Sequence, residues 1–202
     1  MQKLEFKILN QALSYSGFFK LSRYQLQHRR YDGTWSQPLA RELFERGHAA
    51  AILPYDPIAD KIILIEQFRI GAIHSGNSAW LTEIVAGIIE PGETPEQVVH
   101  REALEEAGCQ IIDMEKIYTC FVSPGGTSET ITLYCGCVDA TDIGGIHGCS
   151  EEGEDIRVFT CPFSEALTMV ENGQINSASP IMAIQWLSLN RERLRLMWKK
   201  LR

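Results

Sequence analysis

The chain has 202 residues, of which 45% are hydrophobic, and a formal net charge of −7 at pH 7. That length suits one domain of good size, or a main domain with a small appendage, and the apolar content is enough for a buried core. The negative charge argues against a nucleic-acid partner, because such binding depends on neutralising phosphates with lysine and arginine. No apolar stretch approaches the ~20 residues that span a bilayer, and the first residues lack a signal-peptide pattern. We therefore expect a cytoplasmic protein without a membrane partner.

The six cysteines form no C-x-x-C pair and have no histidine at zinc-finger spacing. Most of them lie in apolar, strand-like runs such as YTCFV and LYCGCV. Because a free cysteine packs as a small hydrophobic residue, we interpret them as reduced thiols of the core.

Residues 1–47 alternate polar and apolar side chains in short runs around a turn signal at 31–34, which predicts a small antiparallel β unit. The next two runs, HAAAILPYD and KIILIEQFR, are nearly continuous in apolar residues and are joined through Asp56, Pro57 and Asp60. This composition predicts a hairpin whose strands are buried on both faces.

A helix is predicted between Pro95 and Ala107. Thr94 suits the N-cap, and Gln97 completes a T-x-x-Q capping box with it. Gly108 fits the position just past the last turn.

Strand-like segments follow at KIYTCFV and ITLYCGCV, then a glycine- and acid-rich loop at 139–155, and a last strand at RVFTCPF. Two helices complete the chain, one at SEALTMVENG and a longer one from about Pro180. Strands with helices before and after them predict an α/β (α+β) fold, with a mixed sheet covered on both sides.

The helix between Pro95 and Ala107 gathers carboxylates. Glu102, Glu105 and Glu106 occupy one arc of roughly 100° on it, with Arg101 at the border. Like charges at this spacing repel, so either the face is solvated and the glutamates are incidental, or the cluster serves a purpose. Oxygen-only ligands on a rigid helix suit hard cations, Mg²⁺ or Mn²⁺, rather than zinc.

The sequence around these glutamates favours a functional role for the cluster. Residues 87–109, GIIEPGETPEQVVHREALEEAGC, match the Nudix box, and the chain therefore resembles the Nudix hydrolases. The resemblance implies a Nudix fold with its catalytic domain at 48–202, beside the N-terminal unit at 1–47. It also implies that the loop–helix–loop holds divalent metal against a diphosphate, and that the reaction splits a nucleoside diphosphate from another group.

The segment SPGGTSE points to one branch of the family. Pro124 lies sixteen residues after Gly108, a placement typical of Nudix proteins that hydrolyse ADP-ribose. The likeness extends through ERGHAA, EQFRI, EIVAG, GIHG and the acidic run that ends in EDIRV. It implies Mg²⁺-dependent hydrolysis of ADP-ribose to AMP and ribose 5-phosphate, by attack of water on a diphosphate phosphorus, with Mn²⁺ as the alternative cation. The other readings are a different substrate, such as GDP-mannose, UDP-glucose or NADH, and a sensor that binds ADP-ribose without cleaving it.

The same resemblance implies roles for individual residues. The expected metal ligands are Glu102, Glu106, Glu154 and the backbone carbonyl of Ala86. Glu152 is expected to be the general base, with Glu105 and Arg101 tuning the metal site. Substrate contacts are expected from Arg69 to the diphosphate, Phe18 and Arg41 around the adenine, Glu129 at the terminal ribose, and Ile88.

Several of these assignments have structural alternatives. The acidic run could be a solvated turn, Arg69 a surface residue at a strand end, and Phe18 part of the core. His147 is expected to shape its loop rather than to act as an acid or base. Finally, the resemblance implies a homodimer whose N-terminal β units exchange, so that both subunits line each site.

Overall fold

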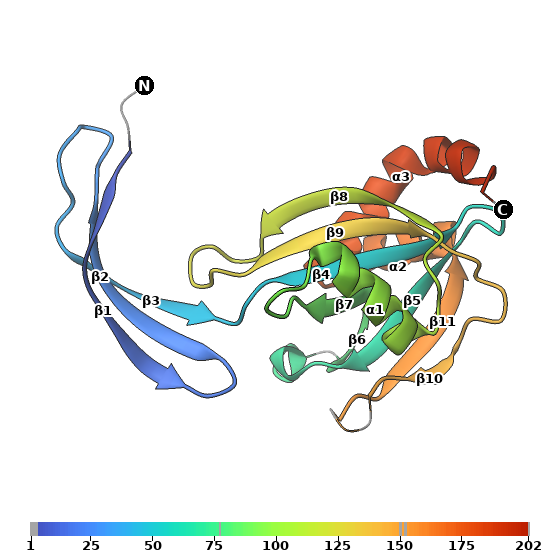
Figure 1. Ribbon diagram of the computed structural model, residues 1–202, viewed down its shortest axis with the longest axis horizontal. Coiled ribbons are helices and arrows are strands. Elements are labelled where there is room, and N and C mark those ends of the chain that lie inside the picture. Colours follow the sequence, from blue (N-terminus) through green and yellow to red (C-terminus); the bar gives the residue numbers. More distant parts are fainter. Residues whose placement is uncertain (1–3, 77, 150, 152, 202) are drawn as a thin grey trace. The chain divides into compact units, whose positions relative to one another are not determined.

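The computed structural model describes residues 4–76, 78–149, 151 and 153–201 (Figure 1). The chain divides into two compact units. The N-terminal unit comprises Met1–His48 with Cys120–Ile131, and the main unit comprises Ala49–Thr119 with Thr132–Arg202.

The N-terminal unit is built on a three-stranded antiparallel sheet, as predicted. Its strands are β1 (Phe6–Ser16), β2 (Lys20–His28) and β3 (Leu39–Glu45), in that spatial order. All eleven residues of β1 are exposed, so this small sheet buries little apolar surface of its own. The predicted turn after β2 is held by Asp32, whose Oδ1 accepts a hydrogen bond from Thr34 N at 2.8 Å.

The main unit contains an eight-stranded sheet, which confirms the predicted mixed sheet between helices. The spatial order is β10-β11-β5-β4-β9-β8, with β6 paired to β5 and β7 paired to β4. The bounds are β4 (Ala49–Asp56), β5 (Lys61–Phe68), β6 (Trp80–Glu83), β7 (Val85–Ile88), β8 (Asp113–Phe121), β9 (Thr130–Cys137), β10 (Gly145–His147) and β11 (Ile156–Pro162), with a 3₁₀ turn η1 (Ile70–Ala72) after β5.

The predicted hairpin is formed by β4 and β5, with Tyr55 opposite Ile62. Every residue of β4 is buried, which confirms the expectation from its continuous apolar run. Asp56 shapes the turn, because its Oδ1 accepts hydrogen bonds from Ile58 N and Ala59 N at 2.8 and 2.9 Å.

Three helices cover the sheet: α1 (Pro95–Ala107), α2 (Phe163–Glu171) and α3 (Ala178–Trp198). In Figure 1, α1 lies in front of the sheet, and α2 and α3 lie behind it. The apolar side of α1 packs on the sheet, where Val98, Val99 and Ala103 join the same core cluster as Ile63 and Ile65.

The ends of α1 are those predicted. Thr94 Oγ1 accepts from Gln97 N at 3.3 Å, Gln97 Oε1 accepts from Thr94 N at 2.8 Å, and Gly108 ends the helix in the left-handed region at φ 59°. Three strands were not predicted. The strands β6 and β7 have four residues each, and β10 has three, within what was expected to be a loop at 139–155. Such lengths are too short to show an alternating pattern.

The cysteines are reduced, and Cys109, Cys135, Cys137 and Cys161 are buried as expected of core residues. Burial raises the pKa of the Cys109 and Cys161 thiols to about 11. Cys120 is only partly buried, and Cys149 is exposed in the loop after β10. Among the described residues, no helix is both long and apolar enough to cross a membrane.

Candidate functional site

Glu106, on the last turn of α1, lies against the strand that precedes this helix. Its Oε2 accepts a hydrogen bond from Ala86 N on β7 at 3.0 Å, and the residue is only 3% exposed. Ala86 is held by its pairing with Ala51 on β4. Two residues that the sequence predicted to share a metal are therefore neighbours in a rigid part of the fold.

Glu102, one turn earlier, crosses the same strand at Gly87. A Cβ added to Gly87 would collide with Glu102 Oε1 and the carbon atoms behind it. The glycine that begins the Nudix box is thus required by the approach of a carboxylate rather than by a special backbone angle.

Arg101 holds the carboxylates around it. Its Nε and Nη2 donate to the two oxygens of Glu93 at 3.2 and 3.3 Å, and its Nη1 donates to Glu102 Oε1 at 2.7 Å and to Glu105 Oε2 at 3.1 Å. These hydrogen bonds hold the pKa of Glu93 below its usual range and raise that of Arg101. One guanidinium therefore orients three glutamates of the box.

The surroundings of Glu102 and Glu106 disfavour the ionised form of their carboxyl groups. Burial raises the pKa of Glu106 to about 8, and the nearby Glu102 and Glu154 carboxylates add to the rise, whereas the Ala86 N–H and the charge of Arg69 oppose it. Burial also raises the pKa of Glu102. A cation bound nearby would favour the ionised form of these clustered, partly desolvated carboxylates at neutral pH.

The donor set fits a divalent cation of the Mg²⁺ type, because all of its atoms are oxygens. Within the described part of the chain, which leaves out Glu152, no three carboxylate, imidazole or thiol groups converge as ligands. Each predicted glutamate ligand instead accepts a hydrogen bond from the protein: Glu102 from Arg101, Glu106 from Ala86 N, and Glu154 from Cys149 N at 3.0 Å. In this structure each of the three carboxylates is therefore held by an N–H donor of the protein.

Arg69 follows β5 and is held by a partner that sequence reasoning missed. Its Nε donates to Glu83 Oε2 at 2.8 Å, and Gln67 Nε2 donates to the same oxygen at 3.4 Å. The Arg69 side chain is 43% exposed, and its charge lowers the pKa of Glu106, so it lies close to the carboxylate cluster. The signal for Glu83 was present in EIVAG, but pairing of β5 with β6 was needed to connect it with Arg69.

The acidic loop brings Glu154 to the cluster, while the predicted base Glu152 lies outside the described residues. Glu154 N donates to Cys149 O at 3.1 Å, and Cys149 N donates back to Glu154 Oε2. His147 Nε2 lies 3.0 Å from Gly144 O. Hence the histidine shapes its loop, as expected.

Three residues that were predicted to bind the substrate, Phe18, Arg41 and Glu129, belong to the N-terminal unit. Phe18, at the turn between β1 and β2, is 87% exposed, so the alternative that it belongs to the core is wrong. Arg41 is exposed on β3, and its Nη1 donates to Ala40 O at 2.7 Å. Glu129 is 8% exposed and lies 3.5 Å from Arg46 Nε. In the main unit, Ile88 pairs with Ala49 and is 37% exposed.

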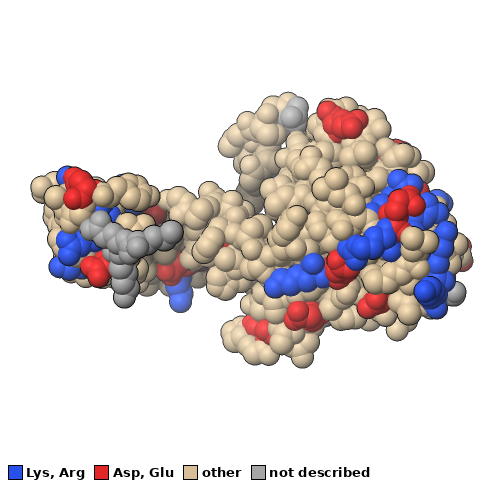
Figure 2. Space-filling model, turned by 90° about the horizontal axis from the view of Figure 1, so that it is seen from above, with Lys and Arg blue, Asp and Glu red and all other residues tan. Residues whose placement is uncertain are grey.

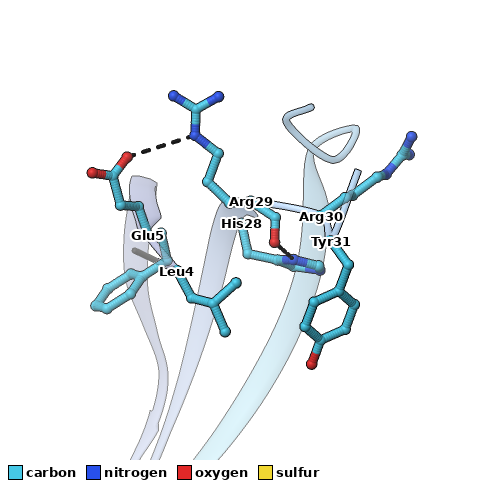
Figure 3. Close-up of a pocket in the computed structure, with 7 residues that line it drawn as sticks. Leu4, Glu5, His28, Arg29, Arg30 and Tyr31 are labelled. Carbon is cyan, nitrogen blue, oxygen red and sulfur yellow. Dashed lines mark hydrogen bonds and ion pairs between the residues drawn. The ribbon is translucent and has the colours of Figure 1, made fainter. Parts of the chain in front are cut away.

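A hollow of the N-terminal unit lies apart from the predicted site residues. A cavity of about 380 Å³ in the N-terminal unit contains none of the predicted site residues (Figure 3). It is lined by Leu4, Glu5, Phe6, His28, Arg29, Arg30 and Tyr31. Figure 3 shows Arg29 reaching Glu5, with Nε 3.6 Å from the carboxylate oxygen.

Charges are interspersed on the face drawn in Figure 2, where basic side chains of the main unit lie among acidic ones. On α3, Arg193 forms an ion pair with Glu115 at 2.7 Å, and Arg191 forms one with Asp60 at 2.9 Å. These cations therefore fasten α3 to the unit.

The sheet, the covering helices and the carboxylate-bearing α1 define a Nudix protein. A family model described as the NUDIX domain matches residues 45–194, and the chain belongs to this family. It is 44% identical to the ADP-ribose pyrophosphatase of Escherichia coli (strain K12), over 97% of this chain and 94% of that protein. The ADP-ribose pyrophosphatase of Haemophilus influenzae is 41% identical, over 97% and 92%.

Two further relatives are more distant. The GDP-mannose pyrophosphatase of Yersinia pestis (strain Pestoides F) is 34% identical, over 86% of both chains. A solved structure described as an ADP compounds hydrolase superposes with a TM-score of 0.70, covering 98% of each chain. At 21% identity, that structure supports the fold alone.

Proposed function

We propose that this protein is an Mg²⁺-dependent hydrolase that cleaves ADP-ribose to AMP and ribose 5-phosphate. The observation that carries the proposal is the intact Nudix box. Arg101 orients three of its carboxylates, those of Glu93, Glu102 and Glu105. Glu106 accepts a hydrogen bond from Ala86 N. The substrate is suggested by the relatives named ADP-ribose pyrophosphatase, which align over nearly the whole chain.

Glu102, Glu106 and Glu154, with the carbonyl of Ala86, would hold the cation. Mn²⁺ is the alternative to Mg²⁺ for such oxygen ligands. Bound there, a divalent ion polarises the diphosphate and neutralises its negative charge, so that an acidic site accepts an anionic substrate. Arg101, which also donates to Glu105, would keep Glu102 in place beside it.

Arg69 would bind the diphosphate oxygens. Its contact with Glu83 uses Nε, and a guanidinium carries further donors on its terminal nitrogens in a fork that suits phosphate. As negative charge develops on the leaving phosphate, this positive group stabilises it. Glu152 would accept a proton from the attacking water, a role that stays a prediction from the sequence.

We also infer a homodimer in which the N-terminal unit exchanges with its partner. The sheet of this unit exposes large apolar side chains on β1, among them Phe6, Ile8, Leu13 and Tyr15, each more than half exposed. A second subunit would cover such a surface. In this arrangement Phe18, Arg41 and Glu129 would serve the adenosine and the terminal ribose, with Ile88 beside the substrate.

Mixed dimers test the exchange. Glu106→Gln protein and Arg41→Ala protein, each expected to have little activity alone, are denatured together and refolded in equal amounts. If each site combines two subunits, one site of every heterodimer is intact, and about a quarter of the wild-type activity returns. A mixture as inactive as its components contradicts the exchange.

Product analysis tests the reaction itself. Purified protein is incubated in ¹⁸O-water with Mg²⁺ and ADP-ribose, in parallel with GDP-mannose, UDP-glucose and NADH, with and without EDTA. We expect EDTA-sensitive AMP from ADP-ribose as the preferred reaction, and label in AMP would identify attack at the adenosyl phosphate. A clear preference for GDP-mannose would favour the second candidate, which the Yersinia relatives support. ADP-ribose binding without turnover would indicate a sensor.

A further inference from the structure

His147, at the end of β10, faces the Nudix helix. The strand β10 pairs with β11, so that His147 lies opposite Ile156 and Ile146 lies opposite Arg157. Because successive residues of a strand point to opposite faces, His147 shares the face of Ile156, which is buried in the core with Ala103 and Ala107 of α1. Ile146 points the other way and is 68% exposed.

The imidazole lies against the C-terminal end of α1. A Cβ added to Gly108 would be 2.7 Å from His147 Cε1 and 3.4 Å from Nδ1. Gly108 therefore has two tasks, because it ends the helix at a left-handed backbone angle and leaves room for the ring. Next to Cε1 in the ring, Nε2 donates to Gly144 O at 3.0 Å, which fixes the ring orientation.

The contacts continue from His147 to Glu154. Gly148 has φ 99°, and a Cβ there would be 2.8 Å from Glu154 Cβ. Glu154 is also held by Cys149 through the two hydrogen bonds between them. A chain of close contacts therefore runs from the end of α1, through His147 and Gly148, to Glu154.

We propose that His147 is a positioning residue, which fixes the Glu154 carboxylate relative to Glu102 and Glu106 by docking β10 on the end of α1. The inference rests on the proposed function in one respect, the role of Glu154 as a metal ligand. His147 touches no reacting atom, so it acts through Glu154. A purely structural role would lower stability and leave metal affinity unchanged.

Three variants test this role, with Mn²⁺ alone as the probe of the site. Mn²⁺ binding to the full-length chain is measured by electron paramagnetic resonance without substrate, beside kcat, KM and thermal unfolding. We expect His147→Ala to stay folded and to bind Mn²⁺ about tenfold more weakly, as is typical when a group that orients a ligand is lost. We expect its kcat for ADP-ribose to fall while KM changes by less than about twofold.

Two matched controls sharpen the result. His147→Gln places an amide N–H near the original Nε2, so it should restore Mn²⁺ affinity to within about threefold of wild type. Ile146→Ala changes the neighbouring, outward-facing residue and should leave both affinity and kcat unchanged. Mn²⁺ affinity in His147→Ala equal to wild type overturns the proposal, and so does failure of glutamine to improve on alanine.

A double-mutant cycle examines the contact with Gly108. Gly108→Ala should weaken Mn²⁺ binding in the wild-type background and have a smaller effect in His147→Ala, where the ring is absent. The backbone strain at this left-handed position is common to both backgrounds and cancels. Equal effects in the two backgrounds contradict the inference. A wild-type protein that binds Mn²⁺ but cleaves no ADP-ribose contradicts the proposed function instead, while the binding measurements still decide the role of His147.

Discussion

The helix α1 and the loop after β10 both bring glutamates to one cluster, but they are held in different ways. The helix has a capping box at one end, a left-handed glycine at the other and a buried apolar side between them. Glu154 itself lies outside the helices and strands, and it is held by contacts with Cys149 and Gly148, which follow His147. A glutamate on a helix is thus positioned by local sequence, whereas a glutamate on a loop is positioned by contacts with the rest of the fold.

The largest effect is expected at the buried end of the helix. Glu106→Gln removes a negative charge from the proposed metal ligands, so turnover of ADP-ribose should fall by more than about 100-fold. This loss is larger than the usual effect of replacing a residue that only orients a metal ligand. The metal-free protein should nevertheless unfold at a higher temperature, because a neutral amide replaces a carboxylate whose pKa is raised by burial. Steady-state kinetics and calorimetry measure both. A variant with reduced activity and reduced stability would indicate a structural role instead.

A smaller loss is expected where the strand meets the helix. Gly87→Ala puts a methyl group in the space of the Glu102 carboxylate, which must rotate away. Mn²⁺ affinity should weaken about 10- to 100-fold. Gly125→Ala is a suitable control, since nothing lies within 4 Å of a Cβ added there. Equal affinities in the two variants would show that Glu102 does not bind the cation.

Glu83→Gln separates the substrate from the metal. The amide cannot form an ion pair with Arg69, whose guanidinium then loses its fixed orientation. KM for ADP-ribose should rise about three- to tenfold, and Mn²⁺ affinity should stay within about twofold. Titration of both ligands measures this difference. A variant that loses metal affinity but keeps its KM would place Glu83 with the cation rather than with Arg69.

The smallest effect concerns the attachment of α1 to the sheet. Tyr134 OH donates to Glu96 Oε1 at 2.6 Å, joining β9 to the first turn of the helix. Tyr134→Phe should lower the free energy of unfolding by about 1–2 kcal/mol, the usual cost of one such hydrogen bond, and leave Mn²⁺ affinity unchanged. Urea denaturation measures the change. No loss of stability would mean that this contact does not hold the helix.

The contrast between local signals and contacts across the fold also separates the features that the sequence predicts from those that it does not. Thr94, Gln97 and Gly108 are local signals, and they predict the bounds of α1 without reference to any other part of the chain. The pairing of Arg69 with Glu83 depends on the register between β5 and β6, and β6 is too short to be recognised from its pattern. The contact between His147 and Gly108 likewise joins two elements that no local rule connects.

The N-terminal unit shows a second reason why parts of the fold could not be predicted from the sequence. Its three strands alternate polar and apolar residues and are predictable for that reason. The segment 120–131 joins this unit through contacts between parts far apart in sequence, such as the hydrogen bond from Phe44 N to Gly126 O. The exposure of Phe18 follows from its place in a hairpin turn, which residue type alone does not reveal.

Proton release on metal binding tests the central claim, that the carboxylates of α1 are gathered for a divalent cation. The pKa of Glu106 is raised from its ordinary value near 4.5 to about 8, so at pH 7 this carboxyl is mostly protonated and must lose its proton to bind metal. The folded state holds this proton more tightly than the unfolded state. The stability of the metal-free protein should therefore fall as the pH rises from about 5 to about 8.

The measurement is Mg²⁺ titration by calorimetry at pH 7 in buffers of different ionisation enthalpy. We expect release of close to one proton per site, decreasing toward zero above about pH 9 as Glu106 ionises without metal. Tight binding without proton release, or no binding at any of these pH values, would contradict the account.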